Sequence, residues 1–293
     1  MTRGDLDGLA CAAIITSCEA IDWVRLVHPQ QIVHKEVTIT RDDILANLPF
    51  HPDARLWFDN DLATASDTPP PEELQQRYAG APSAAHVVYE HYLADHPEIA
   101  RFQPLLEAVD RLDSGRLSKE DILEPQGYIL LGYTLDPRSG LGPIDDYFHV
   151  LLDGLKEEGL EAILEYPEVL EREKALREQD RQFRDATRSS SRRDGNVVVT
   201  DFRGADPIPV GNRFIVYTLF PDTNVSVRLQ WGPVREGIVV SVGRSILNRT
   251  ASVDVGALMA RYGGGGHAAA GSCLLEPDTA DARIAEIVAA LKE

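Results

Sequence analysis

Hydrophobic and polar positions in the first half of the chain alternate between short apolar runs and longer helical patterns. Residues 43–49 and 55–59 are apolar runs of strand length, and the second ends in acidic residues. Helical patterns occupy residues 9–20 and begin again at 82–89, where Pro82-Ser83 has the composition of a helix cap. This alternation predicts a mainly parallel sheet with helices on both faces, in which ligands bind at the carboxyl ends of the strands.

The second half changes from charged helix to short strands. Residues 145–188 are helical and increasingly charged, and 189–195 is predicted to be a flexible joint. Beyond it we expect strands at 197–200, 214–217, 225–229 and 238–242, and helices near 255–261 and 280–291. The sequence thus predicts a two-domain α/β fold. Its parts are a domain at 1–160 with the mainly parallel sheet, a connecting helix and linker at 161–194, and a smaller mixed-sheet domain at 195–293.

The net charge of −18 among 293 residues belongs to the first part of the chain. Residues 191–293 balance 11 basic against 11 acidic side chains, so residues 1–190 carry the whole excess. An acidic lobe attracts divalent cations and repels long duplex nucleic acid, although solubility is an equally good reason for acidity. The three cysteines are odd in number, and neither a membrane span nor a signal peptide is evident. We therefore expect a cytoplasmic protein without a membrane partner.

A glycine run near the C-terminus is the most unusual local feature. It consists of Gly263, Gly264, Gly265 and Gly266 and is followed by His267. Glycine loses more conformational entropy on ordering than other residues, so such a run in a compact domain indicates close backbone approach. Bare backbone amides form a cradle for phosphate oxygens, and the guanidinium of Arg244, after a β-branched strand, suits phosphate too. We predict a substrate-phosphate site here rather than a flexible linker. The run has the pattern of neither a P-loop nor a dinucleotide fingerprint.

Two aspartates near the N-terminus, Asp5 and Asp7, are separated by one residue and followed by Gly8. On an extended segment, side chains two residues apart point the same way, so both carboxylates would face one point. Two converging carboxylates repel each other, which makes a metal ion their natural partner. Alone, this Asp-x-Asp-Gly pattern also fits a calcium loop or a simple turn.

Taken with the other segments, the pattern resembles the DHH phosphoesterase superfamily. The likeness combines Asp-x-Asp-Gly, Phe58-Asp59 at a strand end, Asp113-Ser114 and the glycine run, in family order over essentially the whole chain. It is greatest for the exopolyphosphatase-like and oligoribonuclease-like branch. The resemblance implies an N-terminal DHH domain that binds metal and a C-terminal DHH-associated domain that binds substrate. The implied activity is hydrolysis of a short oligonucleotide, a nucleotide bisphosphate or polyphosphate held between the two domains.

The resemblance also assigns roles to single residues. It makes Asp5 and Asp7 ligands of one or two divalent ions, Mn²⁺ or Mg²⁺. The family's bridging aspartate falls on Asn47, and Asp43 is a poorer stand-in because it precedes the strand. The fourth metal motif falls on Asp113, with Asp110 as the runner-up.

The Asp-His-His signature itself falls on Asp59, Asn60 and Asp61, so both of its histidines are replaced. All three are candidate catalytic residues: Asp59 is expected to contact metal, and Asp59 and Asp61 are expected to orient ligands or water, whereas Asn60 is a poor substitute for imidazole. A site with oxygen ligands alone should prefer magnesium or manganese to softer metals. The same departures favour an alternative function, in which a weakened family member binds a nucleotide or phosphate ligand without turnover.

Several other positions stay open at this stage. The family often has a histidine four residues before the first aspartate; Met1 stands there, which leaves open a start upstream. Arg138, in a turn by composition, is a weaker candidate for a phosphate contact. His86 and His91 are five residues apart on a helix and are expected to be structural. The implied partner is a small phosphorylated substrate or a short single strand, and a homodimer is left open.

Overall fold

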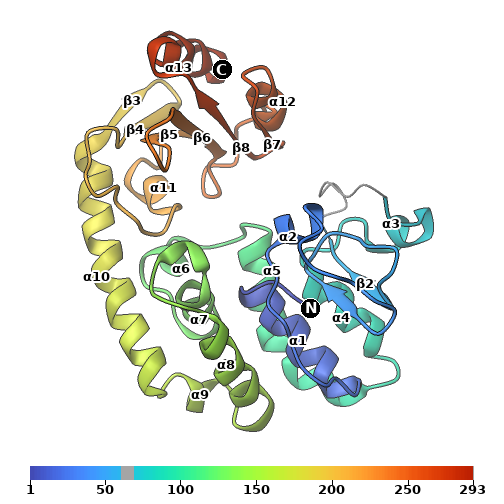
Figure 1. The fold of residues 1–293 in the computed structure, drawn as a ribbon. Helices are drawn as coiled ribbons and strands as arrows, with labels where there is room; N and C mark the ends of the chain where they lie inside the picture. The colour runs from blue at the N-terminus through green and yellow to red at the C-terminus, as the bar shows by residue number, and fades with distance from the viewer. Residues whose placement is uncertain (61–68, 293) are drawn as a thin grey trace. The chain divides into compact units, whose positions relative to one another are not determined.

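The computed structural model of the chain describes residues 1–60 and 69–292, which form two compact units (Figure 1). Unit 1 comprises Met1–Arg116 and Pro125–Leu176, and unit 2 comprises Leu117–Glu124 together with the chain from Arg177 onward. The long helix α10 (Pro167–Ser190) contributes to both. Among the described helices, none has the length and apolar character that crossing a membrane requires.

Unit 1 is mainly helical and contains a small parallel sheet. Strands β1 (Ile44–Ala46) and β2 (Leu56–Phe58) pair in parallel. Its helices are α1 (Leu6–Cys18), α2 (Pro29–Val33), α3 (Glu72–Tyr78), α4 (Ala84–Tyr92), α5 (Gln103–Asp113), α7 (Gly127–Leu135), α8 (Asp145–Glu157) and α9 (Leu160–Ile163), with 3-10 turns η1 (Pro97–Phe102) and η2 (Pro137–Ser139). The predicted strands at 43–49 and 55–59 and the helix at 9–20 are confirmed.

The N-terminal segment lies beside this sheet. Thr2 forms parallel bridges to both Leu26 and Ala46, and the Ala46 amide donates to the Met1 carbonyl at 3.1 Å. Three parallel segments therefore run in one direction and lead into Asp5, Asn47 and Asp59. Because the carboxyl ends of parallel strands meet at one edge of a sheet, this edge gathers the polar residues that follow them.

Helix α1 starts at this edge and is buried along most of its length. Asp5 is its N-cap, and its side chain accepts a hydrogen bond from the Gly8 amide at 2.9 Å. A helix that is apolar on all sides belongs in a core, and every residue from Leu6 to Ile15 is buried. A β-carbon at Gly8 would lie 1.9 Å from the Arg3 carbonyl oxygen, so only glycine fits this tight first turn.

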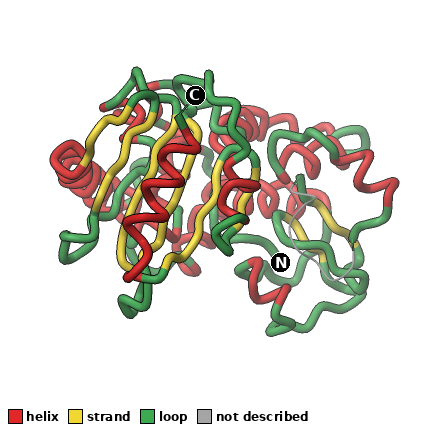
Figure 2. Tube along the Cα trace, turned by 90° about the horizontal axis from the view of Figure 1, so that it is seen from above, coloured by secondary structure: helices red, strands yellow, loops and turns green. Residues whose placement is uncertain are grey.

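Unit 2 is built on a six-stranded mixed sheet. The strands β3 (Ser191–Asp194), β4 (Val197–Asp201), β5 (Val225–Trp231), β6 (Ile238–Arg244), β7 (Gly265–His267) and β8 (Ala270–Leu275) have the order β3-β4-β5-β6-β8-β7. Only β4 and β5 pair in parallel. One apolar core joins the sheet to residues of α12 (Val255–Ala260) and α13 (Pro277–Leu291), so these two helices cover one face (Figure 2).

The strand predicted at 214–217 is wrong, because these residues enter helix α11 (Ile215–Leu219). β4 and β5 are parallel neighbours, so the chain between them must cross over rather than turn back. Val216 and Tyr217 pack against Val198, in a core separate from that of α12 and α13. The β-branched and aromatic run therefore covers the other face of the sheet.

The short helix α6 (Lys119–Leu123) also belongs to this unit.

The flexible joint predicted at 189–195 is wrong as well. Helix α10 continues to Ser190, and β3 follows at once, antiparallel to β4. The Ser191 hydroxyl lies 2.7 Å from that of Thr200 on the paired strand. Gly195, with φ of 67°, makes the tight turn between the two strands. Serine and arginine, which resemble a linker by composition, here form an edge strand.

Candidate functional site

Asp5 stands at the edge of the small sheet with an extended backbone and a half-buried side chain. Its Oδ1 accepts a hydrogen bond from the side-chain Nδ2 of Asn47 at 2.9 Å, and its Oδ2 lies 3.1 Å from Nε of Arg3. Burial raises the pKa of Asp5, whereas Arg3 and the Gly8 amide lower it. Asn47 has a left-handed backbone, with φ of 55°, a conformation for which asparagine is enriched. Asn47 thus holds Asp5 directly; its proposed contact with metal remains a prediction.

Asp7 is almost fully buried, at 3% exposure, and lies in the first turn of α1. The start of α4 holds its carboxylate: the Ala84 amide donates to Oδ2 at 3.1 Å and the Ala85 amide to Oδ1 at 2.7 Å. Burial raises the pKa of Asp7 well above its ordinary value, and the charges of Asp113 and Asp5 raise it further. The hydrogen bonds from the two α4 amides lower the pKa, but not enough to cancel this rise.

Asp7 and Asp5 converge for a different reason from the one predicted. Asp5 is extended, but Asp7 is helical, so side-chain alternation along a strand does not apply to the pair. The helix start brings both carboxylates within electrostatic reach of each other.

Four carboxylates act electrostatically on the buried thiol of Cys11. Burial is the largest cause of its strongly raised pKa, and the further causes, in order, are the charges of Asp7, Asp5, Asp59 and Asp113. Cys11 donates weakly to Asp7, with Sγ 3.8 Å from Oδ1. Asp59 is buried at 4% exposure and directly follows β2, and Asp113 ends α5. Four of the five predicted metal-site residues thus lie within electrostatic reach of one buried thiol, and the fifth, Asn47, contacts Asp5; their role as metal ligands remains a prediction.

This gathering of charge fits a divalent cation in its chemistry. Close, buried carboxylates repel one another, and oxygen donors alone suit a hard ion such as Mg²⁺ or Mn²⁺. Within residues 1–60 and 69–292, however, no three His, Cys, Asp or Glu side chains form a ready ligand set. The carboxylates would therefore have to turn toward an ion that binds them.

The rest of the Asp-His-His position is only partly described. Asn60 donates from Nδ2 to the Ala81 carbonyl at 3.2 Å, which ties the end of β2 to the loop before α4. Asp61 lies outside the described residues. The catalytic roles predicted for Asp59, Asn60 and Asp61 remain predictions.

Asp110, the runner-up for the fourth metal motif, is engaged elsewhere. The Ser83 hydroxyl donates to its Oδ1 at 2.6 Å, and Nδ1 of His86 lies 2.9 Å from its Oδ2. Sequence reasoning recognised the helix start at Ser83 but missed this three-residue contact. Asp110 is 27 residues from Ser83 and 24 from His86, so only the packing of α5 on α4 could reveal the contact.

Arg138, the weaker phosphate candidate, lies near the acidic residues. Its guanidinium binds Asp136 through several contacts, among them Nη2 to Oδ2 at 2.6 Å. The hydrogen bonds to Asp136 raise the pKa of Arg138 most, and the charges of Asp5 and Asp113 add to this. Arg138 therefore balances part of the negative charge near the predicted metal site.

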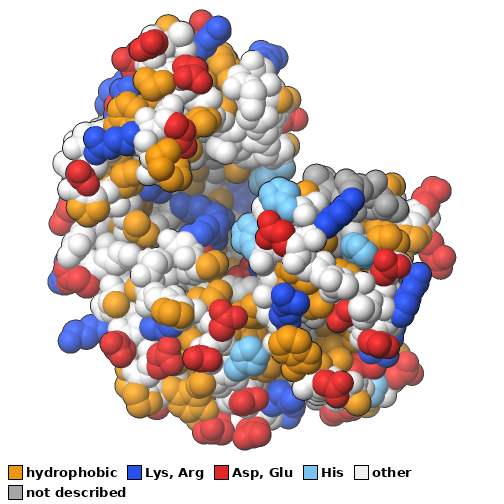
Figure 3. Space-filling view, viewed as in Figure 1, with side chains coloured by type: hydrophobic (Ala, Val, Ile, Leu, Met, Phe, Trp, Pro, Cys, Tyr) orange, Lys and Arg blue, Asp and Glu red, His pale blue; other side chains and the backbone are white. Residues whose placement is uncertain are grey.

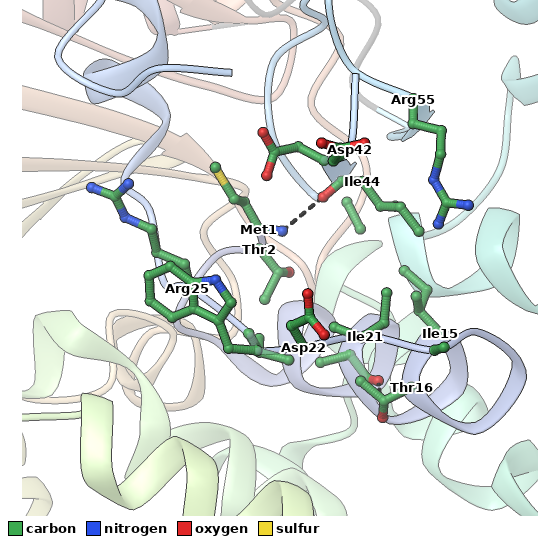
Figure 4. A pocket seen from close by; sticks show the side chains of 16 residues that line it. Met1, Thr2, Ile15, Thr16, Ile21, Asp22, Arg25, Asp42, Ile44 and Arg55 are labelled. Carbon is green, nitrogen blue, oxygen red and sulfur yellow. Dashed lines mark hydrogen bonds between the residues drawn. The ribbon is translucent and has the colours of Figure 1, made fainter. Parts of the chain in front are cut away.

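Asp43, the poorer stand-in for the bridging aspartate, faces a different part of unit 1. Its Oδ2 accepts from both the amide and the hydroxyl of Thr40, at 2.7 and 2.8 Å. Asp43 also lines a cavity of about 220 Å³ between the N-terminal segment, the end of α1 and β1 (Figure 4). There the Met1 amino group donates to the Ile44 carbonyl at 2.7 Å. None of the predicted metal-site residues lines this cavity.

The glycine run of unit 2 forms strand β7 and the turn before it. A β-carbon at Gly264 would lie 2.0 Å from the Ser272 carbonyl oxygen, and one at Gly266 would lie 2.3 Å from the Ala270 carbonyl oxygen. Gly263 and Gly266 also have positive φ, of 76° and 148°. Close packing against β8 and these backbone conformations therefore account for three of the four glycines. Gly265 is different, since a β-carbon there would meet nothing within 4 Å and its φ is not positive.

Arg244 and His267 lie at the same end of this sheet. Gly243 is paired with Ala270, and Ala270 with His267, across β6, β8 and β7. Arg244 donates from Nε to the Val253 carbonyl at 2.8 Å and from Nη2 to the Ser252 carbonyl at 2.7 Å, so it anchors the loop before α12. His267 is exposed and accepts the Ala269 amide at Nδ1, which leaves the proton of a neutral ring on Nε2.

Comparisons with known proteins place this architecture. No protein-family model and no curated protein matches the chain. Among solved structures, the pGpG-specific phosphodiesterase PggH from Vibrio cholerae is 35% identical, with a TM-score of 0.84 and coverage of 98% of both chains. The DHH domain of a protein described as a member of a ribosomal protein family is 14% identical, with a TM-score of 0.65; the match covers 99% of this chain and 86% of that one.

A third structure, RecJ from Thermus thermophilus in complex with Mn²⁺, is also 14% identical, with a TM-score of 0.61. The match covers 99% of this chain and 51% of that longer protein. At such low identity these last two structures support the fold alone. The likeness to PggH extends over nearly the whole of both chains at 35% identity, and the chain thus belongs to the DHH phosphoesterase superfamily.

Proposed function

We propose that this phosphoesterase is a divalent-metal-dependent phosphodiesterase that hydrolyses a short linear dinucleotide such as pGpG. The observation that carries this proposal is the 35% identity to a pGpG-specific phosphodiesterase over 98% of both chains. In the reaction, a water oxygen bonds to phosphorus while the bond from phosphorus to the bridging sugar oxygen breaks. Two mononucleotides result.

Unit 1 would supply the metal site. Asp5, Asp7, Asp59 and Asp113 would hold one or two ions, Mn²⁺ or Mg²⁺. A bound ion in such a site supplies Lewis-acid polarisation and an acidified water. The protein contributes orientation: Asn47 fixes Asp5, and two backbone amides of α4 fix Asp7. Burial excludes water from Asp7 and Asp59 and so strengthens their pull on a cation.

Unit 2 would hold a phosphate of the substrate. We propose that Nε2–H of His267 donates to a phosphate oxygen, because its other ring nitrogen is already occupied by the Ala269 amide. The packing of the strand does not explain why position 265 is glycine. We propose that the absence of a side chain there lets the substrate approach the backbone closely. That one substrate reaches both units remains a prediction from the sequence.

The charge of the chain supports a short substrate. With 47 acidic against 29 basic residues, the chain has too little positive charge to track a long polyanion. Acidic side chains are spread over the visible face of the protein rather than confined to one patch (Figure 3). A dinucleotide needs only a few phosphate contacts, which His267 and the glycine run could provide.

The test is a panel of substrates with the full-length protein and Mn²⁺. We expect turnover of pGpG to exceed that of a 3′,5′-bisphosphate nucleotide, inorganic polyphosphate and a 20-nucleotide single strand, and we expect EDTA to abolish it. Asp7→Asn is the inactive control. Preferential hydrolysis of another substrate would overturn the choice of pGpG. Binding of pGpG without turnover, measured by calorimetry, would favour the alternative of a ligand-binding member.

A further inference from the structure

Three side chains form a closed set of contacts around the first turn of α4. The Ser83 hydroxyl caps the helix by accepting the His86 amide at 3.0 Å, and it donates to Oδ1 of Asp110 at 2.6 Å. The other carboxylate oxygen of Asp110 lies 2.9 Å from Nδ1 of His86. Because a carboxylate only accepts, His86 donates here. Every member of the set thus contacts the two others.

This set, which we call the α4 clamp, comprises Ser83, His86 and Asp110. It directly adjoins the two amides that hold Asp7. The first amides of a helix have no partner within the helix, and those of Ala84 and Ala85 find theirs in the Asp7 carboxylate. The position of Asp7 therefore depends on the path of the backbone between Ser83 and His86, which the α4 clamp determines.

The clamp also connects α4 to α5. Asp110 lies on α5 three residues before Asp113, so both occupy the same side of that helix. Asp113 is the neighbour whose charge raises the pKa of Asp7 most. A single contact set thus fixes the α4 amides that hold Asp7 relative to the helix that carries Asp113.

The three residue types are those of a serine hydrolase triad, but their order is not. In such a triad histidine lies between serine and the carboxylate, where it removes the serine proton. Here the carboxylate of Asp110 lies between the other two, and Ser83 is completely buried. The hydroxyl is therefore a structural donor and not a nucleophile.

We infer that Ser83, His86 and Asp110 are positioning residues for Asp7, and that through α4 they set the affinity of the acidic site for a divalent cation. The part concerning the cation rests on the proposed function; the hold on Asp7 does not. Residues that orient metal ligands from outside typically contribute about 10- to 100-fold in metal affinity or activity. We expect an effect in the lower part of this range, because the two amides would still be present.

The decisive comparison is His86→Ala against His86→Asn. Asparagine can place its Nδ2 where Nδ1 of histidine donates, so it should preserve the contact to Asp110, whereas alanine removes it. Glu90→Gln is the matched control, because Glu90 is the exposed neighbour of the other ring nitrogen, at 3.5 Å. Asp110→Asn is the second variant, which keeps an acceptor for Ser83 but no longer attracts His86 as a carboxylate does.

Hydrogen exchange of the Ala84 and Ala85 amides gives a readout that needs neither metal nor substrate. In His86→Ala we expect both amides to exchange about tenfold faster, and His86→Asn and Glu90→Gln to match the wild type. Calorimetry should then show roughly tenfold weaker Mn²⁺ binding for His86→Ala, and the Mn²⁺ concentration that gives half-maximal turnover of pGpG should rise by about the same factor.

The results separate this inference from the proposed function. Unchanged exchange at Ala84 and Ala85 in folded His86→Ala and Asp110→Asn would overturn the positioning role. Equal losses in His86→Asn and His86→Ala would overturn it too, since the donor would not matter. If the wild type proved inactive on every phosphate compound, faster exchange in His86→Ala would still support the hold of the α4 clamp on Asp7.

Discussion

Oδ1 of Asp7 accepts a hydrogen bond from the Ala85 amide at 2.7 Å, across 78 residues of sequence. The same carboxylate is thus a candidate metal ligand and the partner of a helix N-terminus. Anions are stabilised at such a terminus by the free amides and the helix dipole. Because Asp7 has both roles, its substitutions must distinguish a lost ligand from a loosened helix.

The pair Asp7→Asn and Asp7→Ala makes this distinction. Asparagine keeps an acceptor for only one of the two α4 amides and turns an NH2 donor toward the other, but it also removes a buried charge, so in EDTA we expect it to lose less stability than Asp7→Ala. Alanine leaves the buried Ala84 and Ala85 amides without a partner and should lose about 1–3 kcal/mol. Both variants should lose Mn²⁺ binding and turnover of pGpG. Urea unfolding in EDTA and activity assays provide the two measurements; substantial activity in either variant would remove Asp7 from the metal site.

A second pair lies in the glycine run. In Gly264→Ala the new β-carbon would overlap the Ser272 carbonyl oxygen, so we expect a loss of at least about 1 kcal/mol in stability. Gly265→Ala meets nothing within 4 Å and should melt within a few degrees of the wild type. If Gly265 permits close approach of the substrate, the KM of the Gly265→Ala variant for pGpG should nevertheless rise about tenfold, which corresponds to roughly 1.4 kcal/mol. An unchanged KM would mean that the substrate does not contact this position.

The sequence predicts much of the site because several of its residues follow recognisable local patterns. The aspartate at the start of α1, the acidic end of β2 and the glycine run can all be found without knowledge of packing. The prediction for residues 214–217 failed because β-branched residues satisfy a strand pattern, although the parallel pairing of β4 with β5 requires a crossover. Local preference gave way there to tertiary context.

Other parts of the site leave no local pattern. Ser83 and His86 on α4 meet Asp110 on α5, and the α4 amides meet Asp7, only because these helices pack on one another. Asn47 shows the same limit. Its position after a strand can be predicted from the sequence, but its donation to Asp5 depends on a left-handed backbone that the sequence does not specify.

Asp180 on α10 provides a test of pH dependence away from the metal site. It is buried, at 8% exposure, and accepts the Asn212 amide at 3.0 Å. Burial raises its pKa, against the opposing effects of the Asn212 amide, Arg184 and Arg177. The folded state therefore binds a proton more tightly than the unfolded state does. This contribution to stability is complete below the ordinary pKa of 3.8 and is lost as pH rises through the raised value.

Asp180→Asn keeps the acceptor for Asn212 and removes the titration. As pH rises from about 4 to 7, the free energy of unfolding of Asp180→Asn should increase relative to that of the wild type. The increase should be about 1.4 kcal/mol for each unit by which folding raises the pKa of Asp180. Asp185→Asn, an exposed change on the same helix, is the control and should show no such trend. Urea unfolding across this pH range gives the comparison. A constant difference between Asp180→Asn and the wild type would show that Asp180 titrates normally.

Asn47→Asp tests whether the edge of the small sheet faces a cation. Asn47 now donates to Asp5 at 2.9 Å; an aspartate there would replace this bond with a second carboxylate at contact distance. Without metal the two charges repel, so in EDTA we expect a loss of about 1–2 kcal/mol, equivalent to roughly one pKa unit of mutual perturbation. With metal the added negative charge should bind a cation, and Mn²⁺ affinity should rise at least tenfold.

Asn47→Ala is the matched control, because it removes the bond to Asp5 without adding charge and should weaken Mn²⁺ binding. For Asn47→Asp, unfolding in EDTA should thus show lower stability, whereas calorimetry should show tighter Mn²⁺ binding. Weaker Mn²⁺ binding in Asn47→Asp than in the wild type would place the cation away from Asn47 and Asp5.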